Sequence, residues 1–565
     1  MSAQIGDSMR IALAQLNPLV GDIQGNVRKA LKAHGEAEAG KADLLVLTEL
    51  FVTGYPPEDL ILKPAFVAAA MAGVESLAAA TASSRTAILV GTPWKEDGKV
   101  YNAVALLDGG KVVGVRYKAD LPNYGVFDEK RVFAAGPMPG PVNFRGVRLG
   151  VPICEDIWAE EVCECLSETG AELLIVPNGS PYTTTKVDQR MNIAAKRIAE
   201  TGLPMLYVNQ VGGQDELVFD GASWVLNADS SMAVQLPAWE ECVRVSEWVR
   251  EGGGWKCVPG AKALVEEGDA ADYLACVNGL RDYVRKNGFP GVVLGMSGGI
   301  DSALCAAMSV DALGADKVHC VMLPYRYTSN ESLNDAGKCA EALGARYDIL
   351  PIAAPVDGFG SGLEPLFDGL PPDTTEENIQ SRARGTMLMA ISNKFGSMVV
   401  TTGNKSEVSV GYATLYGDMN GGFNPIKDLY KTRVYALARF RNAHLPKGCL
   451  GPKGIVIPPN ILVKAPTAEL RENQKDQDSL PPYDVLDDIL ACLVEEEMPL
   501  AGIVERGHDP ATVSRVERLL YLAEYKRRQA APGVKISSRN FGRDRRYPIV
   551  NKFRESPQAG GGPAS

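Results

Sequence analysis

The 565-residue sequence predicts an α/β protein with two domains. In the first half, apolar runs alternate with amphipathic helical patterns, which is typical of a layered α/β body. Residues 237–262 interrupt this pattern with glycine, proline and three of the six tryptophans, which indicates a domain boundary. A strand, a glycine-containing loop, a helix and a second strand follow within 291–323, which predicts a βαβ unit of a parallel sheet.

The first domain is expected to span residues 1–250. Helices are predicted at 22–38, where Asp22 is a suitable N-cap, and at the alanine-rich segment 59–82. A hairpin is predicted at 101–118, because Asp108-Gly109-Gly110 favours a tight turn. Further strands are predicted at 10–17, 43–49, 87–91, 147–154, 172–178, 204–209 and 222–226. Glycine-rich punctuation then predicts a linker at 251–268.

The second domain is expected to span residues 269–552. It begins with predicted elements at 270–287 (helix), 291–295 (strand), 301–313 (helix) and 318–323 (strand). Residues 446–482 are rich in proline, glycine and charge, which indicates a long ordered loop or a lid. Residues 553–565, which end in PQAGGGPAS, are expected to form a disordered tail.

The composition excludes several classes of protein. Hydrophobic residues make up 45% and charged residues 22%, which is ordinary for a globular chain that buries a large core. The formal net charge of −11 disfavours a nucleic-acid partner, because such proteins are normally basic. No apolar run approaches the roughly 20 residues of a spanning helix, so no membrane association is expected. The start of the chain also lacks the pattern of a signal peptide.

The numbers and spacing of the cysteines and histidines disfavour a disulfide framework and a His-rich metal site. The eleven cysteines include no CxxC pair, and we interpret them as the reduced thiols of a cytoplasmic protein. The four histidines are His34, His319, His444 and His508. They lie far apart, which disfavours a His-rich metal site and leaves few candidates for His-based catalysis.

The loop after the strand 291–295 is suited to bind phosphate. It reads Gly295-Met296-Ser297-Gly298-Gly299-Ile300-Asp301-Ser302 and runs into a predicted helix. Glycines let backbone N–H groups approach an anion, and a helix N-terminus adds positive potential. The loop is not a Walker A loop, because the GxxxxGK[ST] pattern is missing.

Two other interpretations of this loop remain open on the residues alone. The run from Gly295 to Gly299 also matches the GxSxG nucleophile elbow. That interpretation requires an acid and then a histidine downstream, and His444 and His508 lie in no suggestive context. A tight turn without a ligand is the second alternative.

The fuller string SGGIDS resembles the pyrophosphate-binding loop of the ATP pyrophosphatase superfamily, which adenylates substrates and releases AMP and pyrophosphate. The resemblance implies a Rossmann-like parallel-sheet domain, with Asp301 holding Mg²⁺. A carboxylate beside a phosphate cradle makes physical sense mainly if a cation lies between them. The residues that the resemblance assigns to ATP are Gly295, Met296, Ser297, Gly298, Gly299, Ile300, Asp301, Ser302 and Thr402.

Three residues of the first domain form a candidate catalytic set. Glu49, Lys118 and Cys154 each follow an apolar run, so each is expected at the edge of a sheet, where α/β sites usually form. A nucleophilic cysteine needs a base and a group that stabilises the oxyanion. Taken singly, the glutamate and the lysine also fit solvated strand ends, and the cysteine fits a core residue.

Together these residues resemble the nitrilase (carbon–nitrogen hydrolase) superfamily. The matching strings are TELFVTGYPPEDL, YKADLPNYGVFDEKRVF, GVPICEDIW and PNGSPY. The resemblance implies a four-layer α-β-β-α sandwich, in which Glu49 is the general base, Cys154 the nucleophile and Lys118 the group that stabilises the tetrahedral intermediate. Other glutaminase types fit poorly, because position 2 is Ser2 rather than Cys and because Cys154 has no well-placed histidine and no flanking glycines.

A nitrilase-like amidase ahead of an ATP pyrophosphatase resembles the glutamine-dependent NAD⁺ synthetase family over nearly the whole chain. Further matching strings are TEENIQSRARG, TTGNKSE, YGDMNGGFNPIKDLYKTRV, KAPTAELRENQKDQDSLPPYDVLDDIL and YKRRQAAPGVKIS. The resemblance implies the last step of NAD biosynthesis: glutamine releases ammonia, ATP adenylates deamido-NAD⁺, and ammonia displaces AMP. It also implies Mg²⁺ and a homo-oligomer. GMP and asparagine synthetases share the ATP loop, but their glutaminases differ.

The resemblance also assigns substrate-binding positions of the family to individual residues of this sequence. Tyr124, Ser180 and Lys186 match glutamine-binding positions, and their alternatives are core packing, a turn and solvent exposure respectively. The positions that match deamido-NAD⁺ or phosphate contacts are Asn378, Glu407, Lys431 and Lys526. Glu407 is also expected to share Mg²⁺ with Asp301.

Two further points stay open on the sequence. Arg382 and Arg384 are basic enough to meet phosphate, but on a helix such residues are more often solvated. A nitrilase-like domain fused to a nucleotide sensor without catalytic activity is the rival interpretation. Asp301 and Glu407 argue against it, because a sensor need not retain two metal-site carboxylates.

Overall fold

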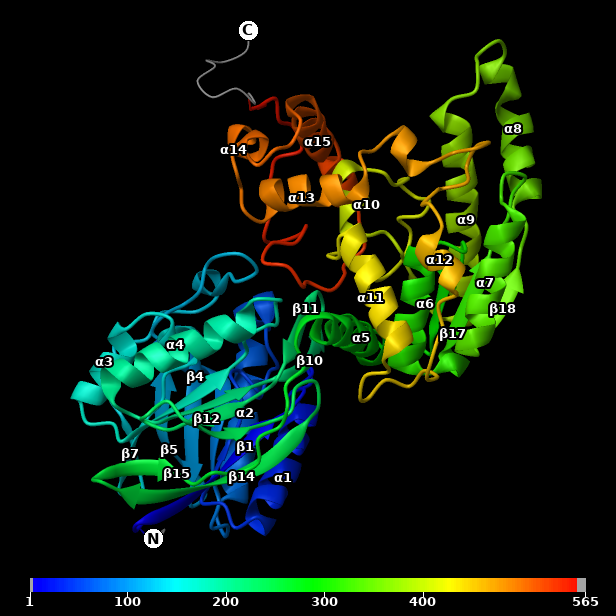
Figure 1. Ribbon diagram of the computed structural model, residues 1–565. Coiled ribbons are helices and arrows are strands. Elements are labelled where there is room, and N and C mark those ends of the chain that lie inside the picture. Colours follow the sequence, from blue (N-terminus) through cyan, green and yellow to red (C-terminus); the bar gives the residue numbers. More distant parts are fainter. Residues whose placement is uncertain (1–3, 556–565) are drawn as a thin grey trace. The chain divides into compact units, whose positions relative to one another are not determined.

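The computed structural model describes residues 4–555 (Figure 1). The chain forms two compact units, of which the first ends at Glu266 and the second begins at Glu267. Both units are mixed α/β, so the predicted fold class is confirmed.

Within residues 4–266, the first unit has a seven-stranded and a six-stranded sheet. In spatial order the seven-stranded sheet consists of β15 (Gly254–Cys257), β14 (Cys242–Glu251), β1 (Ser8–Gln15), β2 (Leu44–Val46), β3 (Ala87–Glu96), β4 (Lys99–Asp108) and β5 (Lys111–Tyr117). The six-stranded sheet consists of β13 (Met232–Gln235), β12 (Trp224–Leu226), β9 (Met205–Asn209), β8 (Leu173–Asn178), β7 (Val147–Gly150) and β6 (Val142–Phe144). A separate hairpin pairs β10 (Val211–Gln214) with β11 (Leu217–Asp220).

Helices cover the outer faces of these two sheets (Figure 1). α1 (Ile23–Ala39) and α2 (Pro64–Ala80) pack on the seven-stranded sheet, and α3 (Glu161–Glu168) and α4 (Lys186–Thr201) pack on the six-stranded sheet. Successive side chains of a strand point to opposite faces. On β1, Ala12 and Ala14 therefore face the helices, whereas Ile11 and Leu13 face the second sheet. The result is the expected four-layer α-β-β-α sandwich.

The segment expected to be a linker is partly strand. β14 continues to Glu251, and Gly254–Cys257 form β15 at the edge of the seven-stranded sheet. Gly252 and Gly253 make the turn between these strands, with φ of 64° and 90°. The glycine cluster therefore marks a hairpin turn, so the first part of the expected linker at 251–268 belongs to the sheet, and the boundary between the units lies near its end, at Glu266.

Several predicted elements are also shorter than expected; the strand predicted at 43–49, for example, is β2, which ends at Val46. The helix predicted at 59–82 is a 3₁₀ helix, η1 (Glu58–Leu62), followed by α2. The break occurs at Lys63, which is extended, because Pro64 has no N–H and begins a new helix at its first position. The strand predicted at 147–154 ends at Gly150, and Cys154 begins a 3₁₀ helix, η3 (Cys154–Ile157).

The second unit is built on a parallel sheet with the order β18 (Arg346–Ile349), β17 (Val318–Met322), β16 (Val292–Gly295) and β19 (Met398–Val400). Its larger helices are α5 (Gly268–Lys286), α6 (Ile300–Leu313), α7 (Asn330–Leu343), α8 (Ala353–Phe367), α9 (Thr374–Phe395), α11 (Lys431–Ala443), α13 (Tyr483–Val494) and α15 (Pro510–Leu522). The shorter helices are α10 (Lys405–Val410), α12 (Pro459–Val463), α14 (Leu500–Glu505), α16 (Glu524–Arg527), η2 (Glu129–Arg131) in the first unit, and η4 (Ala315–Lys317) and η5 (Asp476–Asp478) in the second. Around α13, buried side chains of α10, α14 and α15 form a separate hydrophobic cluster.

The strand order of this sheet reverses at β16. The chain first proceeds from β16 to β17 and β18, and later returns to add β19 on the other side of β16. The loops that follow β16 and β19 therefore leave the same edge of the sheet side by side. Ligands of open parallel sheets bind at such a reversal point, beyond the carboxyl ends of the strands.

Residues 446–482 form a long loop that contains only α12 and η5 as regular elements. Glu469 in this loop accepts hydrogen bonds from Ser329 Oγ and Ser332 Oγ, each at 2.8 Å, at the start of α7. Of the expected disordered tail, residues 553–555 are described, and Glu555 N–H donates to Glu517. Residues 556–565 lie outside the described residues.

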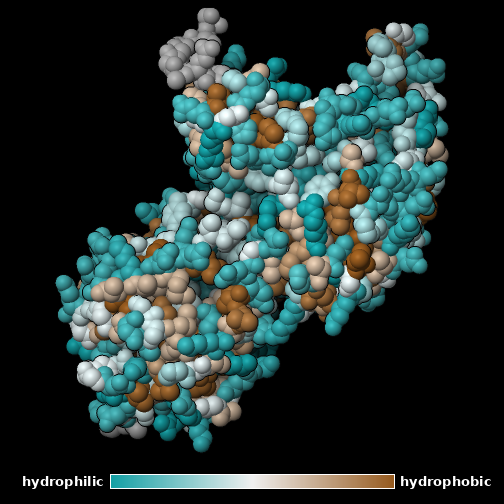
Figure 2. Space-filling model, viewed as in Figure 1, coloured by the Kyte–Doolittle hydropathy of each residue, from teal (hydrophilic) through white to brown (hydrophobic). Residues whose placement is uncertain are grey.

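The viewed surface is mostly hydrophilic, with hydrophobic residues in separate patches (Figure 2). In the described part of the chain, no helix has the length and hydrophobicity to cross a bilayer.

Candidate active sites

A lysine buried between two carboxylates lies at the end of β5 in the first unit. Lys118 Nζ donates to Glu49 Oε1 at 2.7 Å and to both carboxylate oxygens of Glu129 at 3.0 Å. Asn102 Nδ2 donates to the same two carboxylates at 2.8 and 3.2 Å. Burial alone lowers the pKa of Lys118, but the charges of Glu129 and Glu49 raise it above its ordinary value. The lysine is therefore held as an ammonium.

Cys154 lies beside this cluster in an unusual backbone conformation. Its φ of 48° is left-handed, which is uncommon for a non-glycine residue. Burial and then the charge of Glu49 raise the pKa of the thiol, whereas Lys118 and the N–H of Gly179 oppose the increase. The sulfur at rest is therefore a protonated thiol, which needs a base before it can attack.

Glu49 is the carboxylate that is placed to act as this base. Its Oε2 accepts the backbone N–H of Gly179 at 3.0 Å, the same group that also interacts with the Cys154 sulfur. Lys118 and Asn102 hold its other oxygen. The structure thus brings the three predicted residues Glu49, Lys118 and Cys154 together from the ends of β2, β5 and β7.

Asp156 holds the backbone on both sides of this cluster. Its carboxylate accepts the two backbone N–H groups that directly follow Lys118, at 3.0 and 2.8 Å. It also accepts the backbone N–H directly before Cys154, at 2.9 Å. One buried side chain therefore fixes the lysine and the cysteine relative to each other.

A cavity of about 730 Å³ opens next to the cluster. The charged and aromatic residues that line it are Asp120, Tyr124, Lys130, Phe133, Glu155 and Trp158. Tyr124 O–H donates to Glu155 at 2.9 Å. Lys186 Nζ lies 3.7 Å from the centroid of the Trp158 ring, within cation–π range. Tyr124 and Lys186 are therefore both associated with the cavity.

Ser180 occupies a different environment from these two residues. It is buried, and its hydroxyl accepts a hydrogen bond from Arg190 Nε at 3.0 Å. Arg190 also donates to the Ser180 carbonyl at 2.7 Å and to Asp220 at 2.8 Å. This buried ion pair fixes the loop that begins with Gly179, so Ser180 stands next to the group that contacts Cys154.

The predicted phosphate loop joins β16 to α6 in the second unit. Ser297 N–H donates to Ser302 Oγ at 3.2 Å, and the two hydroxyls lie 3.1 Å apart. Gly299 N–H donates to Ser297 Oγ at 3.2 Å. The loop is thus a compact turn at the N-terminus of a fourteen-residue helix, where the helix dipole favours an anion.

Gly298 is required at the tip of this loop for two reasons. Its φ of 79° lies in the left-handed region. A Cβ at this position would also lie 2.3 Å from the carbonyl oxygen of Ser332 in α7, which is a collision with backbone.

A second lysine lies between two carboxylates beside this loop. Lys431 Nζ, at the start of α11, pairs with Asp301 and donates to Glu407 Oε1 at 3.0 Å. Asn404 Nδ2 donates to the other oxygen of Asp301 at 2.8 Å. Burial lowers the pKa of Lys431, but Asp301 and Glu407 raise it overall. Burial raises the pKa of Glu407 to about 7 against the opposing charge of Lys431.

The donor set of this site fits Mg²⁺. Among the described residues, no group of three or more His, Cys, Asp or Glu side chains forms a complete metal cage. Mg²⁺ in nucleotide sites is usually held by one or two carboxylates together with phosphate oxygens and water. Asp301 and Glu407 supply two carboxylates, both within reach of one ammonium and beside a phosphate-type loop.

The remaining predicted contacts lie on the segments around this site. Thr402 follows β19, two residues before Asn404. Lys526 Nζ donates to the carbonyls of Gly411 and Ala413 at 2.8 and 2.6 Å. Asn378 Oδ1 accepts the hydroxyl of Thr414 at 2.9 Å. Asn378 and Lys526 therefore meet on residues 411–414, the segment that follows α10.

The two arginines of α9 differ from each other. Arg382 is exposed, and its Nε donates to the carbonyl of Leu415 at 3.2 Å. Arg384 is half-buried, and its Nε donates to the carbonyl of Leu323 at 2.9 Å, directly after β17. Burial lowers the pKa of Arg384 to about 10. Only Arg382 fits the expectation of a solvated side chain.

The nucleophile-elbow interpretation of the loop finds no support. In the described part of the chain, the side chain of Ser297 contacts Ser302 and Gly299 and no histidine. Each downstream histidine is engaged elsewhere: His319 with Asp348, His444 with Phe440 and His508 with Asp488.

Comparison with known proteins assigns each of the two units to a protein family. Residues 10–251 match the carbon-nitrogen hydrolase family, and residues 273–530 match the NAD synthase family. The glutamine-dependent NAD(+) synthetase of Rhodobacter capsulatus is 53% identical over 97% of this chain and 99% of its own. That of Acinetobacter baylyi is 44% identical over 97% and 99%. The chain belongs to the glutamine-dependent NAD⁺ synthetase family.

Solved structures of the family agree with this assignment. The glutamine-dependent NAD⁺ synthetase of Acinetobacter baumannii, in complex with ADP, is 43% identical with a TM-score of 0.76, over 96% of this chain and 99% of that chain. That of Cytophaga hutchinsonii is 23% identical with a TM-score of 0.79, over 96% and 98%, and shares the fold.

Several side chains of the two candidate active sites were not predicted from the sequence. They are Glu129, Asp156, Glu155, Trp158, Arg190 and Asn404. Most of them lie within the strings that carry the resemblance, but no periodicity or spacing separates them from ordinary surface residues. Glu129 is an example. It lies in the charged run at 128–131, which by composition alone fits a solvent-exposed segment, but in the structure its carboxylate is buried against Lys118.

Replacing Gly298 with alanine is expected to lower ammonia-dependent NAD⁺ synthesis by at least about tenfold, because the added Cβ meets Ser332 and the left-handed φ is strained. Glutamate release without ATP should remain at its wild-type rate. Steady-state assays of both activities check the prediction. Gly337→Ala in α7 is the matched control, because its Cβ would make only an ordinary 3.8 Å contact. An active Gly298→Ala enzyme would show that the loop does not hold the substrate phosphates.

Proposed function

We propose that this chain hydrolyses glutamine in its first unit and uses the ammonia in its second unit to convert deamido-NAD⁺ to NAD⁺, the last step of NAD biosynthesis. The observation that carries the proposal is the pair of preassembled clusters on one chain of this family. One is Glu49 and Lys118 beside Cys154, and the other is Asp301 and Lys431 beside a phosphate-type loop. The products are NAD⁺, glutamate, AMP and pyrophosphate.

In the glutaminase half, Glu49 accepts the thiol proton of Cys154, and the sulfur attacks the carboxamide carbon of glutamine. The C–N bond then breaks, and the proton held by Glu49 leaves with the nitrogen as ammonia. Glu49 next removes a proton from water, which cleaves the thioester to glutamate and restores the thiol. The charges of Glu129 and Glu49 favour the ammonium form of Lys118, so it is preorganised to stabilise the oxyanion of both tetrahedral intermediates.

The cavity beside this cluster suits a zwitterionic amino acid. Asp120 and Glu155 offer carboxylates to an α-ammonium group, and Lys130 offers a cation to an α-carboxylate. Tyr124, Ser180 and Lys186 are the side chains that we propose to contact glutamine. Ser180 would act mainly through its loop, because Arg190 already engages its hydroxyl.

In the synthetase half, a carboxylate oxygen of deamido-NAD⁺ attacks the α-phosphorus of ATP, and pyrophosphate leaves. Ammonia then attacks the acyl carbon, AMP leaves, and a proton is lost to solvent. Free ammonia is already a nucleophile, so this site needs positioning and charge neutralisation rather than a base. The loop 295–302 with Thr402 would hold the phosphates, and Lys431 would face them.

We propose that Asp301 and Glu407 hold Mg²⁺. Two carboxylates and one ammonium leave this site without the positive charge that a triphosphate requires. Bound Mg²⁺ supplies that charge against the phosphate oxygens. Asn378, Glu407, Lys431 and Lys526 are the side chains that we propose for deamido-NAD⁺.

The proposal also includes the cellular compartment and the oligomeric state of the enzyme. None of the eleven cysteines forms a disulfide, which supports a reducing compartment such as the cytoplasm. A homo-oligomer remains a proposal that rests on the family resemblance. Size-exclusion chromatography with light scattering measures its order directly.

A direct assay separates this function from a nucleotide-sensing module. The protein is incubated with glutamine, deamido-NAD⁺, ATP and Mg²⁺, and NAD⁺, AMP, pyrophosphate and glutamate are measured. The proposal requires all four products, with NAD⁺, AMP and pyrophosphate in equal amounts. Glutamate without NAD⁺ would favour the sensor.

Replacing Cys154 with alanine is expected to abolish glutamine-dependent NAD⁺ synthesis and to leave ammonium-dependent synthesis unchanged. The thiol is the nucleophile of the first unit only. Glu49→Gln and Lys118→Ala should have the same phenotype, because the three groups act as a unit. The measurement is NAD⁺ formation with each nitrogen donor. Loss of both activities in a soluble, folded mutant would contradict the separation into two sites.

Replacing Asp301 with asparagine is expected to abolish NAD⁺ synthesis with either nitrogen donor, because a neutral amide ligates Mg²⁺ poorly and the pyrophosphate charge is left uncompensated. Glutamate release without ATP should persist. Titration of Mg²⁺ in the ammonium-dependent assay tests the metal assignment. Near wild-type synthesis by this variant would show that Asp301 is not a metal ligand.

At glutamine concentrations below KM, deamido-NAD⁺ and ATP together are expected to raise the rate of glutamine hydrolysis at least about fivefold, the lower end of a typical 1–3 kcal/mol coupling in binding between sites. Ammonia that escapes at neutral pH is protonated and ceases to be a nucleophile, so an uncoupled glutaminase wastes glutamine. Glutamate release with and without the two substrates measures the effect, and Gly298→Ala should lose it. Equal rates, with complete capture of the ammonia by an external scavenger enzyme, would exclude both coupling and a shielded route.

A further inference from the structure

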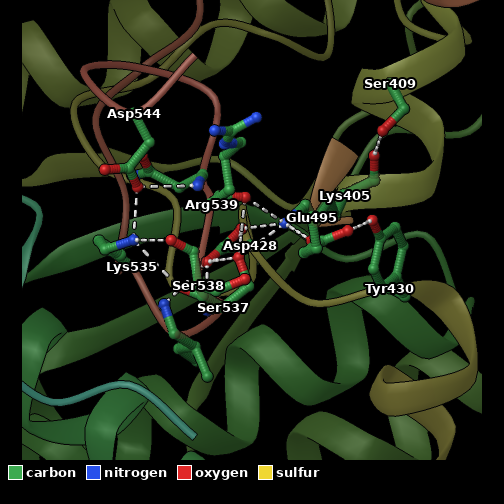
Figure 3. A network of polar contacts seen from close by, with 12 residues as sticks. Lys405, Ser409, Asp428, Tyr430, Glu495, Lys535, Ser537, Ser538, Arg539 and Asp544 are labelled. Atoms are coloured by element: carbon green, nitrogen blue, oxygen red, sulfur yellow. Dashed lines mark hydrogen bonds and ion pairs between the residues drawn. The ribbon is translucent and has the colours of Figure 1, made fainter. Parts of the chain in front are cut away.

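A buried polar network surrounds Lys405 in the second unit (Figure 3). The side chain of Lys405 is fully buried, and its Nζ lies 2.7 Å from Asp428 Oδ1. It also donates to Ser537 Oγ at 2.7 Å and to the carbonyl of Arg539 at 2.8 Å. Glu495, at the end of α13, completes the set as a second carboxylate. One ammonium therefore joins three segments that are distant in the sequence.

The segment 535–544 supplies two of these partners and is itself held by hydrogen bonds and an ion pair. Asp428 accepts the hydroxyl of Ser537 at 2.8 Å and two backbone N–H groups of the segment at 2.8 and 2.7 Å. Lys535 pairs with Asp544 and donates to the carbonyl of Ser537 at 2.9 Å. The segment thus forms a loop that is closed on itself and bound to Asp428.

Lys405 is the first residue of α10, which carries part of the synthetase site. A helix of six residues closes few internal hydrogen bonds, so outside contacts determine where it begins. Asn404 caps the helix by accepting the N–H of Glu407 at 3.0 Å, and it donates to Asp301 at 2.8 Å. In the sequence, Lys405 therefore lies between Asn404 and Glu407, the two residues of α10 and its cap that reach the proposed metal site.

The same network reaches the start of α11. Glu495 accepts the hydroxyl of Tyr430, the residue before Lys431, at 2.7 Å. The backbone N–H of Lys405 donates to the carbonyl of Leu429 at 2.8 Å. The N–H of Lys431 donates to Ser406 Oγ at 2.9 Å. The starts of α10 and α11 are thus joined through Lys405 and its neighbours.

Charge explains why the partners of Lys405 act as a set. A buried ammonium is tolerated only when carboxylates and further acceptors replace its water. Burial lowers the pKa of Lys405, but Asp428 and Glu495 raise it above its ordinary value. Burial opposes the ionisation of Asp428, but Lys405 and Lys535 lower its pKa. The loss of one member leaves the others buried without compensation.

We propose that Lys405 and the segment 535–544 position the ATP end of the synthetase site by fixing the starts of α10 and α11. Lys405 acts through Glu407 and Lys431 and does not touch the substrate. The inference rests on the synthetase function proposed for this unit. It makes a C-terminal segment that carries no phosphate-binding motif part of the machinery for adenylation.

Four variants of the full-length chain test this role. Ser537→Ala removes one hydroxyl that bridges Lys405 and Asp428. Ser537→Thr keeps a hydroxyl and is the rescue variant. Lys405→Met removes the central charge. Arg539→Ala is the matched control, because it removes a surface pair with Glu497 but leaves the backbone carbonyl that Lys405 contacts.

Ammonium-dependent NAD⁺ synthesis is measured under saturating deamido-NAD⁺, with ATP varied, together with thermal unfolding. We expect Ser537→Ala to lower kcat by about tenfold and Lys405→Met by about a hundredfold, with kcat/KM for ATP falling by the same factors. Equal losses in both parameters indicate an interaction made in the transition state. Ser537→Thr should restore most of kcat, and Arg539→Ala should stay within about twofold of wild type.

The outcomes separate positioning from stability and from the proposed function. A lower unfolding temperature with wild-type kcat in Ser537→Ala would overturn the inference, since only stability would have changed. Equal losses in Arg539→Ala and Ser537→Ala would also overturn it. If Lys405→Met does not fold, the serine pair and its rescue still decide. A wild-type chain that makes no NAD⁺ from ammonium would instead refute the function itself.

Discussion

Each functional region of this chain is organised around a lysine that is buried between two carboxylates. Lys118 lies between Glu49 and Glu129, Lys431 between Asp301 and Glu407, and Lys405 between Asp428 and Glu495. Removing an ammonium from water costs several kcal/mol, so each lysine forces the surrounding backbone to supply acceptors at fixed places. Within each unit, strand ends and helix starts lie where those acceptors are required.

The surplus of one carboxylate in each cluster has a chemical consequence. Burial and then the charge of Glu49 raise the pKa of the Cys154 thiol, which is why the proposed mechanism makes Glu49 take its proton before the sulfur attacks. Around Lys431 the same surplus would leave a place for the proposed Mg²⁺ when a triphosphate binds. In the proposed function, the same arrangement serves proton transfer in the first unit and metal-assisted phosphate chemistry in the second, because the neighbouring group is a thiol in one and a phosphate-type loop in the other.

Sheet topology explains why residues far apart in the sequence meet at these lysines. In the first unit, Glu49 follows β2 of one sheet and Cys154 follows β7 of the other, and the sandwich stacks the two sheets face to face. In the second unit, the strand order reverses between β16 and β19, so the loops carrying Asp301 and Asn404 leave the same edge. Asn404 Nδ2 donates a hydrogen bond to Asp301, which joins the two loops directly.

The sequence by itself determined the local elements of this protein. The strand-to-helix glycine loop, the N-cap at Asp22 and the strand-end positions of Glu49 and Lys118 depend on neighbouring residues, so a linear pattern reveals them. Only the tertiary structure decided that Glu129 joins Lys118, that β15 completes a sheet edge where a linker was expected, and that Ser537 reaches Lys405 from 132 positions away. Such contacts leave no periodicity in the chain, because a buried charge takes its partner from whichever segment the packed core brings next to it.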